Sequence, residues 1–141
     1  MLTQRSRYAL RALIFIARTG GVAPVPISVI AADQKLPRKF LEAILLDLKN
    51  GGLVTSFRGK MGGYRLARPA GQISFGEIIR QIEGPLALVP CVSLSAYQRC
   101  VDCFEEHTCV IRKVMLVIRE QTANILDHTT LADLSLDQVA A

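Results

Sequence analysis

The sequence predicts a mainly α-helical protein, built as a winged helix-turn-helix with a β-hairpin wing and a long C-terminal helix. Three observations support this prediction. Two short helical stretches are joined by about four residues, a hairpin pattern with three glycines in its loop follows them, and an amphipathic stretch covers residues 110–128. This order is typical of domains that place the second short helix in a major groove.

The first helix is predicted over residues 6–18, because apolar residues recur there at helical spacing. A second, short helix begins at Pro26, which suits a first helical position, and ends near Gln34. A third begins at Pro37 and stops at Asn50. The residues expected to face inward are Tyr8, Leu10, Leu13, Ile14 and Ala17 in the first helix, and Phe40, Leu41, Ile44, Leu45 and Leu48 in the third.

A hairpin and a fourth helix follow. The extended runs Leu53–Phe57 and Tyr64–Ala67 flank the glycine-containing loop, which predicts two antiparallel strands. Ser74 and Glu77 have the spacing of a capping box, so a helix is expected from there to Ile82. The long helix over residues 110–128 needs an apolar partner, which is either its own domain or, as we expect, a second copy of the chain.

The charge is divided unevenly along the chain. Residues 1–80 carry 13 Lys and Arg against 4 Asp and Glu, whereas residues 81–141 carry 4 against 8. A basic first half is typical either of a polyanionic partner such as DNA or of a solvated basic face, and together with the helix-turn-helix pattern it favours DNA. We expect neither an enzyme nor a small-molecule substrate, because no phosphate-binding glycine loop, Ser/His/Asp set or paired carboxylates appear. No export signal or membrane span is predicted, so a cytoplasmic protein is expected.

All the cysteines lie between Cys91 and Cys109. Cys100 and Cys103 form a C-x2-C pair, which is tight enough to grip one metal centre. An iron–sulfur cluster, a structural zinc site and a thiol/disulfide switch all remain open, although zinc sites usually show two such pairs. A small thiol oxidoreductase is disfavoured because the pair does not follow a strand of a βαβ unit. His107 lies in the same segment and could replace one thiol.

Several motifs together resemble the IscR/NsrR-type regulators, which are bacterial winged-helix repressors. They are RYALRAL, VPISVIAADQKLPRKFLEAILLDLKNGGLV, FRGKMGGYRLAR and ISFGEIIRQIEGP, and the resemblance covers residues 1–134. Many of these regulators sense through an iron–sulfur cluster. The resemblance implies a homodimer, in which the helix near 108–127 packs against its partner and two recognition helices read a pseudo-palindromic duplex. It departs at Lys35, where relatives often have a glycine in the turn.

The resemblance also implies which residues contact DNA. Glu42 matches a recognition-helix glutamate that can accept a hydrogen bond from cytosine N4, although a solvated pair with a neighbouring lysine is the alternative. Arg58 matches an arginine that enters the minor groove. The other basic residues are expected at phosphates, and the glycines let the wing turn tightly. The predicted DNA-binding residues are Arg38, Lys39, Glu42, Arg58, Gly59 and Lys60.

The resemblance finally implies a cluster, of [2Fe-2S] or [4Fe-4S] type, that senses redox state, nitric oxide or iron supply. Relatives usually carry three cysteines, and Cys103 and Cys109 keep the spacing of the last two. Some relatives add an acidic ligand on the first helix, where this chain has Arg7, so Cys100 becomes the candidate fourth ligand. The predicted ligands are Cys91, Cys100, Cys103 and Cys109. The predicted units are a DNA-binding domain (1–84), a sensor loop (85–109), and a dimerisation helix with a tail (110–141).

Overall fold

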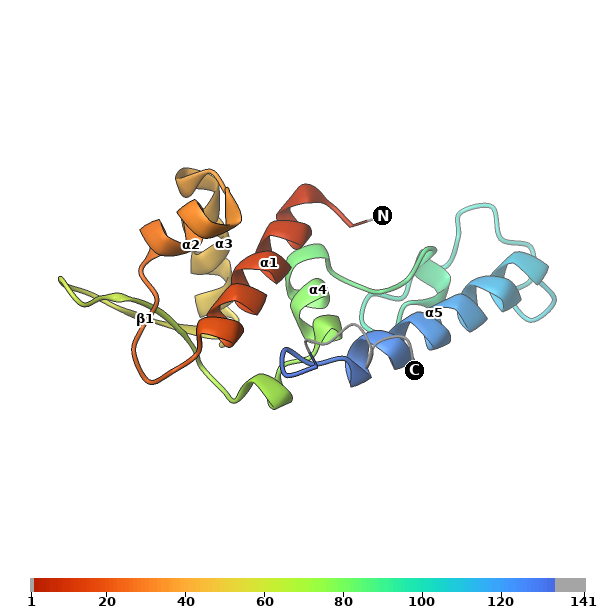
Figure 1. Cartoon of the computed structure of the whole chain (residues 1–141). Helices are drawn as coiled ribbons and strands as arrows, with labels where there is room; N and C mark the ends of the chain where they lie inside the picture. Colours follow the sequence, from red (N-terminus) through yellow and green to blue (C-terminus); the bar gives the residue numbers. More distant parts are fainter. Residues whose placement is uncertain (1, 134–141) are drawn as a thin grey trace.

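The structure is a computed structural model that describes residues 2–133, so the tail from residue 134, part of the predicted C-terminal unit, lies outside it. A winged-helix body is joined to a long helix that extends away from it (Figure 1). The predicted fold class is confirmed. The elements are α1 Gln4–Thr19, α2 Ile27–Gln34, α3 Arg38–Asn50, β1 Val54–Phe57, β2 Gly63–Leu66, α4 Phe75–Glu83 and α5 Val110–His128, with 3-10 turns η1 Ala70–Gln72 and η2 Pro90–Val92.

Helix α1 is the centre of the body and contacts α2, α3, α4 and β2. It begins at Gln4, earlier than predicted, because Thr3 caps it by accepting a hydrogen bond from the Ser6 amide at 3.3 Å. Being surrounded, it buries more than one face. Tyr8, Ile14 and Ala17 are only half-buried against the core, and the fully buried positions are Ser6, Ala9, Leu10, Ala12, Leu13 and Ile16.

The turn between α2 and α3 depends on Lys35, which adopts the left-handed conformation with φ 52° and ψ 49°. It is the one non-glycine residue with positive φ between residues 2 and 133. The backbone amide of Leu36 then donates to the carbonyl of Ala31 at 3.0 Å, and the Leu36 side chain is buried. Pro26 and Pro37 precede their helices as N-caps with extended backbone, rather than occupying the first helical position as predicted.

Helix α3 buries the predicted stripe with one exception. Leu41, Ile44, Leu45 and Leu48 are buried, whereas Phe40 is 44% exposed. Phe40 instead packs edge-on against Tyr8 of α1, with ring centroids 5.8 Å apart. The surface of α3 opposite the buried stripe makes no core contacts and faces solvent.

The wing is an antiparallel pair whose register runs from Val54 opposite Leu66 to Phe57 opposite Gly63. A third segment, absent from the prediction, joins its edge, because Val25 and Tyr64 exchange backbone hydrogen bonds of 2.8 Å in both directions. A β-carbon on Gly63 would overlap the backbone of Val25, so the close approach needs glycine at this position.

The predicted cap of α4 is confirmed, since Ser74 accepts a hydrogen bond from the Glu77 amide at 3.1 Å. The chain returns to this point after α5, where the Leu131 amide donates to the carbonyl of Ile73 at 3.0 Å and the Leu131 side chain is fully buried. Between residues 2 and 133, no helix is both long and apolar enough to cross a membrane.

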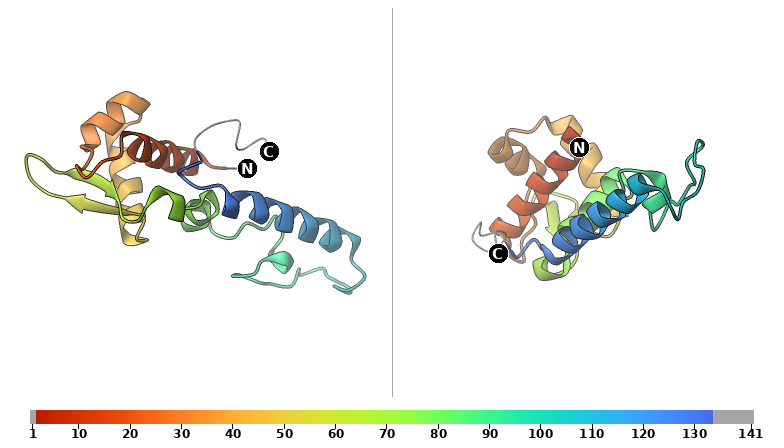
Figure 2. Two further views of the ribbon diagram at one scale, coloured as in Figure 1. Left: turned by 60° about the horizontal axis from the view of Figure 1, so that its bottom comes forward. Right: turned by 90° about the vertical axis from the view of Figure 1, so that its right-hand side faces the viewer.

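One ion pair joins α4 to α5. Arg80 donates from Nη1 and Nη2 to the two carboxylate oxygens of Asp127, at 2.5 and 3.0 Å. Gly76 makes room for this pair, because a β-carbon there would overlap Oδ1 of Asp127. From this joint α5 runs outward, away from the wing, and the cysteine segment lies along its far part (Figure 2).

Candidate nucleic-acid interface and cysteine cavity

Three of the predicted DNA-contacting side chains lie on the exposed surface of α3. Arg38, Lys39 and Glu42 point away from the buried stripe because helical spacing puts them on the other side. Arg38 Nε lies 3.4 Å from Glu42 Oε1, and the two side chains are 61% and 54% exposed. Glu42 therefore has a helical ion-pair partner, an arginine rather than the lysine of the alternative interpretation, and such an exposed pair is worth about 0.3–0.5 kcal/mol.

The other three lie in the exposed loop between β1 and β2. Gly59 has φ 97°, a backbone conformation that residues with a side chain rarely adopt. Arg58 and Lys60 lie on either side of it in the sequence. Arg38, Gly59 and Lys60 line one hollow of about 300 Å³, together with Ser28 at the start of α2. The fold thus brings the start of α3 and the wing together. Lys39, Glu42 and Arg58 do not line this hollow.

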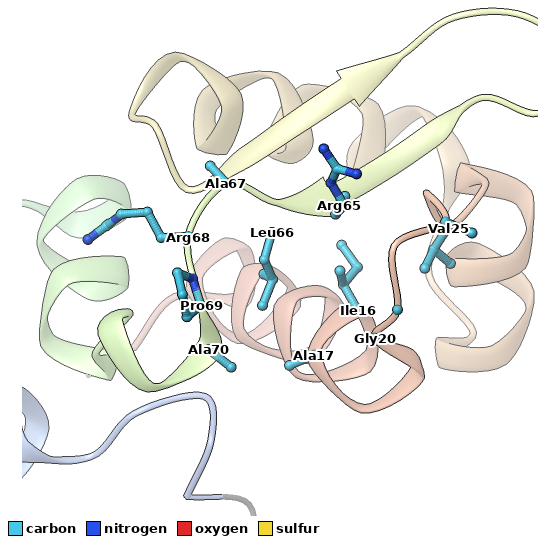
Figure 3. A pocket seen from close by; sticks show the side chains of 12 residues that line it. Ile16, Ala17, Gly20, Val25, Arg65, Leu66, Ala67, Arg68, Pro69 and Ala70 are labelled. Atoms are coloured by element: carbon cyan, nitrogen blue, oxygen red, sulfur yellow. The ribbon is translucent and has the colours of Figure 1, made fainter.

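Arg65, which the sequence places among the basic residues of the wing, supports the wing from its side. Its guanidinium lies 4.7 Å from the ring centroid of Phe57 and donates to the carbonyl of Val22 at 3.0 Å. Figure 3 shows Arg65 beside Leu66 at a hollow of about 490 Å³ between β2 and the end of α1. Apart from Arg68, which points toward α4, the other residues labelled there are small or aliphatic. This hollow is therefore a poor candidate for a catalytic or metal site.

All four cysteines line one cavity of about 440 Å³ at the start of α5. Cys91 belongs to η2 and is buried, with 5% of its surface exposed, while Cys100, Cys103 and Cys109 are half-buried. The structure therefore brings the predicted ligands together. His107 is exposed and does not line the cavity. Arg7 is exposed on α1 and does not line it either.

Short-range hydrogen bonds fold the cysteine segment into this shape. The Gln98 amide donates to the carbonyl of Pro90 at 3.2 Å, which returns the chain to the turn that carries Cys91. The Tyr97 hydroxyl donates to the carboxylate of Glu106, which joins two parts of the segment, and this bond raises the pKa of Tyr97. The spacing of the cysteines in the sequence predicts none of these hydrogen bonds.

Two arginines lie close to the cysteines. Arg99 donates from Nη2 to the backbone carbonyls of Cys103 and Phe104 at 3.4 and 3.2 Å, and its interaction with the Cys103 side chain raises the pKa of Arg99. The backbone N–H of Arg112 donates to the sulfur of Cys109 at 3.4 Å. The sulfur of Cys109 thereby caps the N-terminus of α5, where the helix dipole favours negative charge. Asp102, Glu105 and Glu106 line the same cavity, and their carboxylates disfavour negative charge on the sulfurs.

The pKa of Cys100 is raised, first by its side-chain interaction with Cys91 and then by burial and by the charges of Cys91, Asp102 and Cys103. All four cysteines are free thiols.

The donor set consists of four thiols, which as thiolates bind either an iron–sulfur cluster or zinc. Among residues 2–133, no three histidine, cysteine or carboxylate side chains are gathered as ligands of one metal ion. The four cysteines do line one cavity, so Cys91, Cys100, Cys103 and Cys109 are the residues that would hold such a centre.

A helix-turn-helix, an adjoining wing and exposed basic side chains on both define a winged-helix DNA-binding regulator. The comparisons with known proteins agree. The chain belongs to the Rrf2 family, whose model is described as an iron-dependent transcriptional regulator and matches residues 2–137. The resemblance stated from the motifs is thereby confirmed at the level of the family.

Three relatives illustrate the match. A helix-turn-helix transcriptional regulator of Rhodobacter capsulatus, described as Rrf2-like, is 42% identical over 137 residues, covering 95% of this chain and 91% of its own length. The structure of CymR, described as the global cysteine regulator of B. subtilis, has a TM-score of 0.79 at 34% identity and covers 95% of each chain. IscR of T. potens has a TM-score of 0.75 at 30% identity, covering 95% of this chain and 85% of that one.

Proposed function

We propose that the chain is a homodimeric, sequence-specific regulator, in the first instance a repressor, whose DNA affinity is controlled by an iron–sulfur cluster on the Cys91–Cys109 segment. The observation that carries the proposal is the convergence of all four cysteines on one cavity at the start of α5. The family description and the IscR neighbour support it. The cluster, [2Fe-2S] or [4Fe-4S], supplies a centre that responds to oxidation, nitric oxide and iron supply.

The exposed side of α5 supports the homodimer. None of its side chains is fully buried in the single chain. Its exposed apolar residues recur at helical spacing along one side, which we call the α5 apolar face. A contiguous apolar surface on a helix is stable in water when a partner covers it, and a two-fold pair is the commonest arrangement. The face consists of Val110, Val114, Val117, Ile118 and Ile125.

In the dimer, two copies of α3 would read two half-sites of a pseudo-palindrome. Arg38, Lys39 and Lys60 would contact phosphates and give affinity that weakens with salt. Glu42 would accept a hydrogen bond from cytosine N4, and Arg58 would enter the minor groove beside it. Gly59 would let the wing turn tightly beside the duplex.

Two contacts link the cysteine segment to the DNA-binding body. Arg119 of α5 donates from Nη1 to the carbonyl of Val92 at 2.8 Å, beside Cys91. Arg80 and Asp127 then join α5 to α4. Ordering or release of the cysteine segment would reach the wing through these contacts, and a coupling of about 1–3 kcal/mol changes DNA affinity roughly 5- to 150-fold.

A thiol/disulfide-switched regulator is the second candidate, and the place of Cys91 and Cys100 in one cavity, where their interaction raises the pKa of Cys100, favours it. These two thiols could form a disulfide by losing two protons and two electrons to hydrogen peroxide or a low-molecular-weight disulfide. The cysteine regulator of B. subtilis and an oxidised form of S. aureus CymR are structural relatives, which supports the same interpretation. A zinc-stapled regulator is a weaker candidate. In each case we propose binding rather than catalysis, so dithiol turnover should not exceed that of free thiols.

The test is anaerobic purification of the full chain, with counts of iron, acid-labile sulfide and zinc. DNA affinity is then measured for a duplex that the protein selects from random sequences, before and after oxygen exposure. Iron with sulfide, together with a change in affinity on cluster loss, is expected. Zinc without sulfide, or equal affinity of the loaded and cluster-free protein, would contradict the proposal.

Two variants test the ligand assignment. Cys100→Ser should lower the iron and sulfide content, because it removes a thiolate from the cavity. His107→Ala is the matched control, since His107 lies in the same segment but outside the cavity. Cluster loss in His107→Ala, with retention in Cys100→Ser, would show that the fourth ligand is histidine.

A further inference from the structure

Arg112 carries a side-chain donor that has no partner. Its Nε is shielded from solvent and makes no hydrogen bond within residues 2–133, the only side-chain nitrogen or oxygen there in that state. Arg112 lies in the first turn of α5 and lines the cysteine cavity. A buried donor without an acceptor costs free energy, so its presence requires an explanation.

Another arginine of the same helix shows the contrast. Arg119 is mostly enclosed, with 11% of its side chain exposed. Its Nη1 donates to the carbonyl of Val92 and its Nη2 to the carboxylate of Glu120. An enclosed arginine on α5 can therefore find acceptors within the chain, whereas Nε of Arg112, beside the cysteine cavity, has none.

A bound centre would supply the missing acceptor as sulfur. The backbone N–H of Arg112 donates to the sulfur of Cys109 at 3.4 Å, and Arg112 lines the cavity that all four cysteines share. Within residues 2–133 neither a carboxylate nor a thiol accepts a hydrogen bond from Nε. Four thiolates would bring negative charge to this place, next to the positive end of α5.

We propose that Nε–H of Arg112 donates a hydrogen bond to a sulfur of the centre held by the four cysteines and thereby raises its reduction potential. This inference rests on the proposed function. Reduction adds one electron and leaves more negative charge on the sulfurs, so a donor and a positive charge stabilise the reduced form more than the oxidised form. Arg112 is thus a tuning residue, and the thiolates remain the ligands.

The test is a potentiometric titration of anaerobically reconstituted full chain, comparing wild type, Arg112→Gln, Arg112→Lys and Lys113→Gln. Lys113 follows Arg112 on α5 and is exposed. Lys113→Gln is the matched control, because it removes one positive charge from the helix, as Arg112→Gln does. Arg112→Gln is expected to lower the ratio of reduced to oxidised centre at a fixed poise about tenfold, equal to about 59 mV for one electron. Lys113→Gln should stay near wild type.

Arg112→Lys separates the hydrogen bond from the charge, because it keeps the charge without Nε. We expect it to shift in the same direction by at least half as much, with a matching change in the iron–sulfur stretching bands. A potential equal to wild type in Arg112→Lys, or equal shifts in Arg112→Gln and Lys113→Gln, would overturn the inference. If the wild type takes up no iron and sulfide, the proposed function itself fails, which is a separate result.

Discussion

Replacing Gly76 by alanine should destabilise the protein by removing the Arg80–Asp127 pair. The β-carbon would overlap Oδ1 of Asp127 and lie 3.0 Å from Nη1 of Arg80. The two side chains are 40% and 39% exposed, so screening by solvent limits the pair to about 0.5–1 kcal/mol. Displacing the carboxylate adds about 1 kcal/mol of overlap. Alanine returns about 0.5 kcal/mol of helix preference, which leaves a net loss of about 1 kcal/mol.

The sign of this effect should reverse when Asp127 is absent. In an Asp127→Ala background the overlap and the pair are both gone, so Gly76→Ala should stabilise by about 0.5 kcal/mol. Urea denaturation measures the cost of Gly76→Ala in the wild-type and in the Asp127→Ala background. The protein concentration is kept fixed, because dimerisation would make stability depend on it. An equal cost of Gly76→Ala in the two backgrounds would refute this account of the joint.

The same pair predicts a pH dependence. The hydrogen bond from Arg80 holds the pKa of Asp127 below its usual 3.8, even though burial acts against it. A depressed carboxylate pKa contributes stability that is present above the ordinary value and is lost as the pH falls through the folded value. The cost of Asp127→Asn should therefore be measurable at pH 6 and vanish in strong acid.

Four further predictions follow from separate parts of the chain. Lys35→Gly should stabilise by about 0.5–1 kcal/mol by relieving the left-handed backbone, seen as a higher Tm, and a lower Tm would contradict it. Val117→Glu should give a monomer by light scattering, whereas Lys113→Glu on the same helix should stay dimeric. Arg58→Gln should weaken DNA binding, and an unchanged affinity would show that Arg58 lies outside the interface. Where Arg58 also neutralises a phosphate, the slope of log affinity against log salt concentration should become shallower by about 1. Glu83, whose pKa is lowered by hydrogen bonds from Ser6 and Thr3, should lose its stabilising contribution as the pH falls below about 4.5, so Glu83→Gln should flatten the acid side of a plot of Tm against pH.

Local patterns in the sequence were sufficient for the helices and the wing. The apolar stripe of α3 and the Ser74 cap involve residues within a few positions of each other, so their signals lie in one short window. The contacts that complete the body are different. Val25 pairs with Tyr64, and Leu131 enters the core from beyond α5. Each involves a single residue and a distant partner, so no periodicity reveals it.

The candidate site divides in the same way. The four thiols were identifiable as a group because they lie close together in the sequence, and the resemblance to known regulators pointed to the exposed residues of α3. Arg112 and Arg119 were not identifiable, since an arginine on an amphipathic helix normally reads as a solvated residue. Their roles depend on how η2 folds back against α5, which is a tertiary property. The predicted domain boundaries and the cluster itself stay predictions.

The placement of the two ends of α5 has a mechanical consequence. The joint with Arg80 lies near its C-terminal end, and Cys109 caps the opposite end. With 19 residues the helix is about 28 Å long, so it would act as a lever arm between the thiols and a fulcrum at α4. A tilt of about 5° displaces the far end by about 2.5 Å, which is comparable to the length of a hydrogen bond. Small rearrangements among the sulfurs thus correspond to small angles at the fulcrum, and two such levers in a pair would set the spacing between the wings.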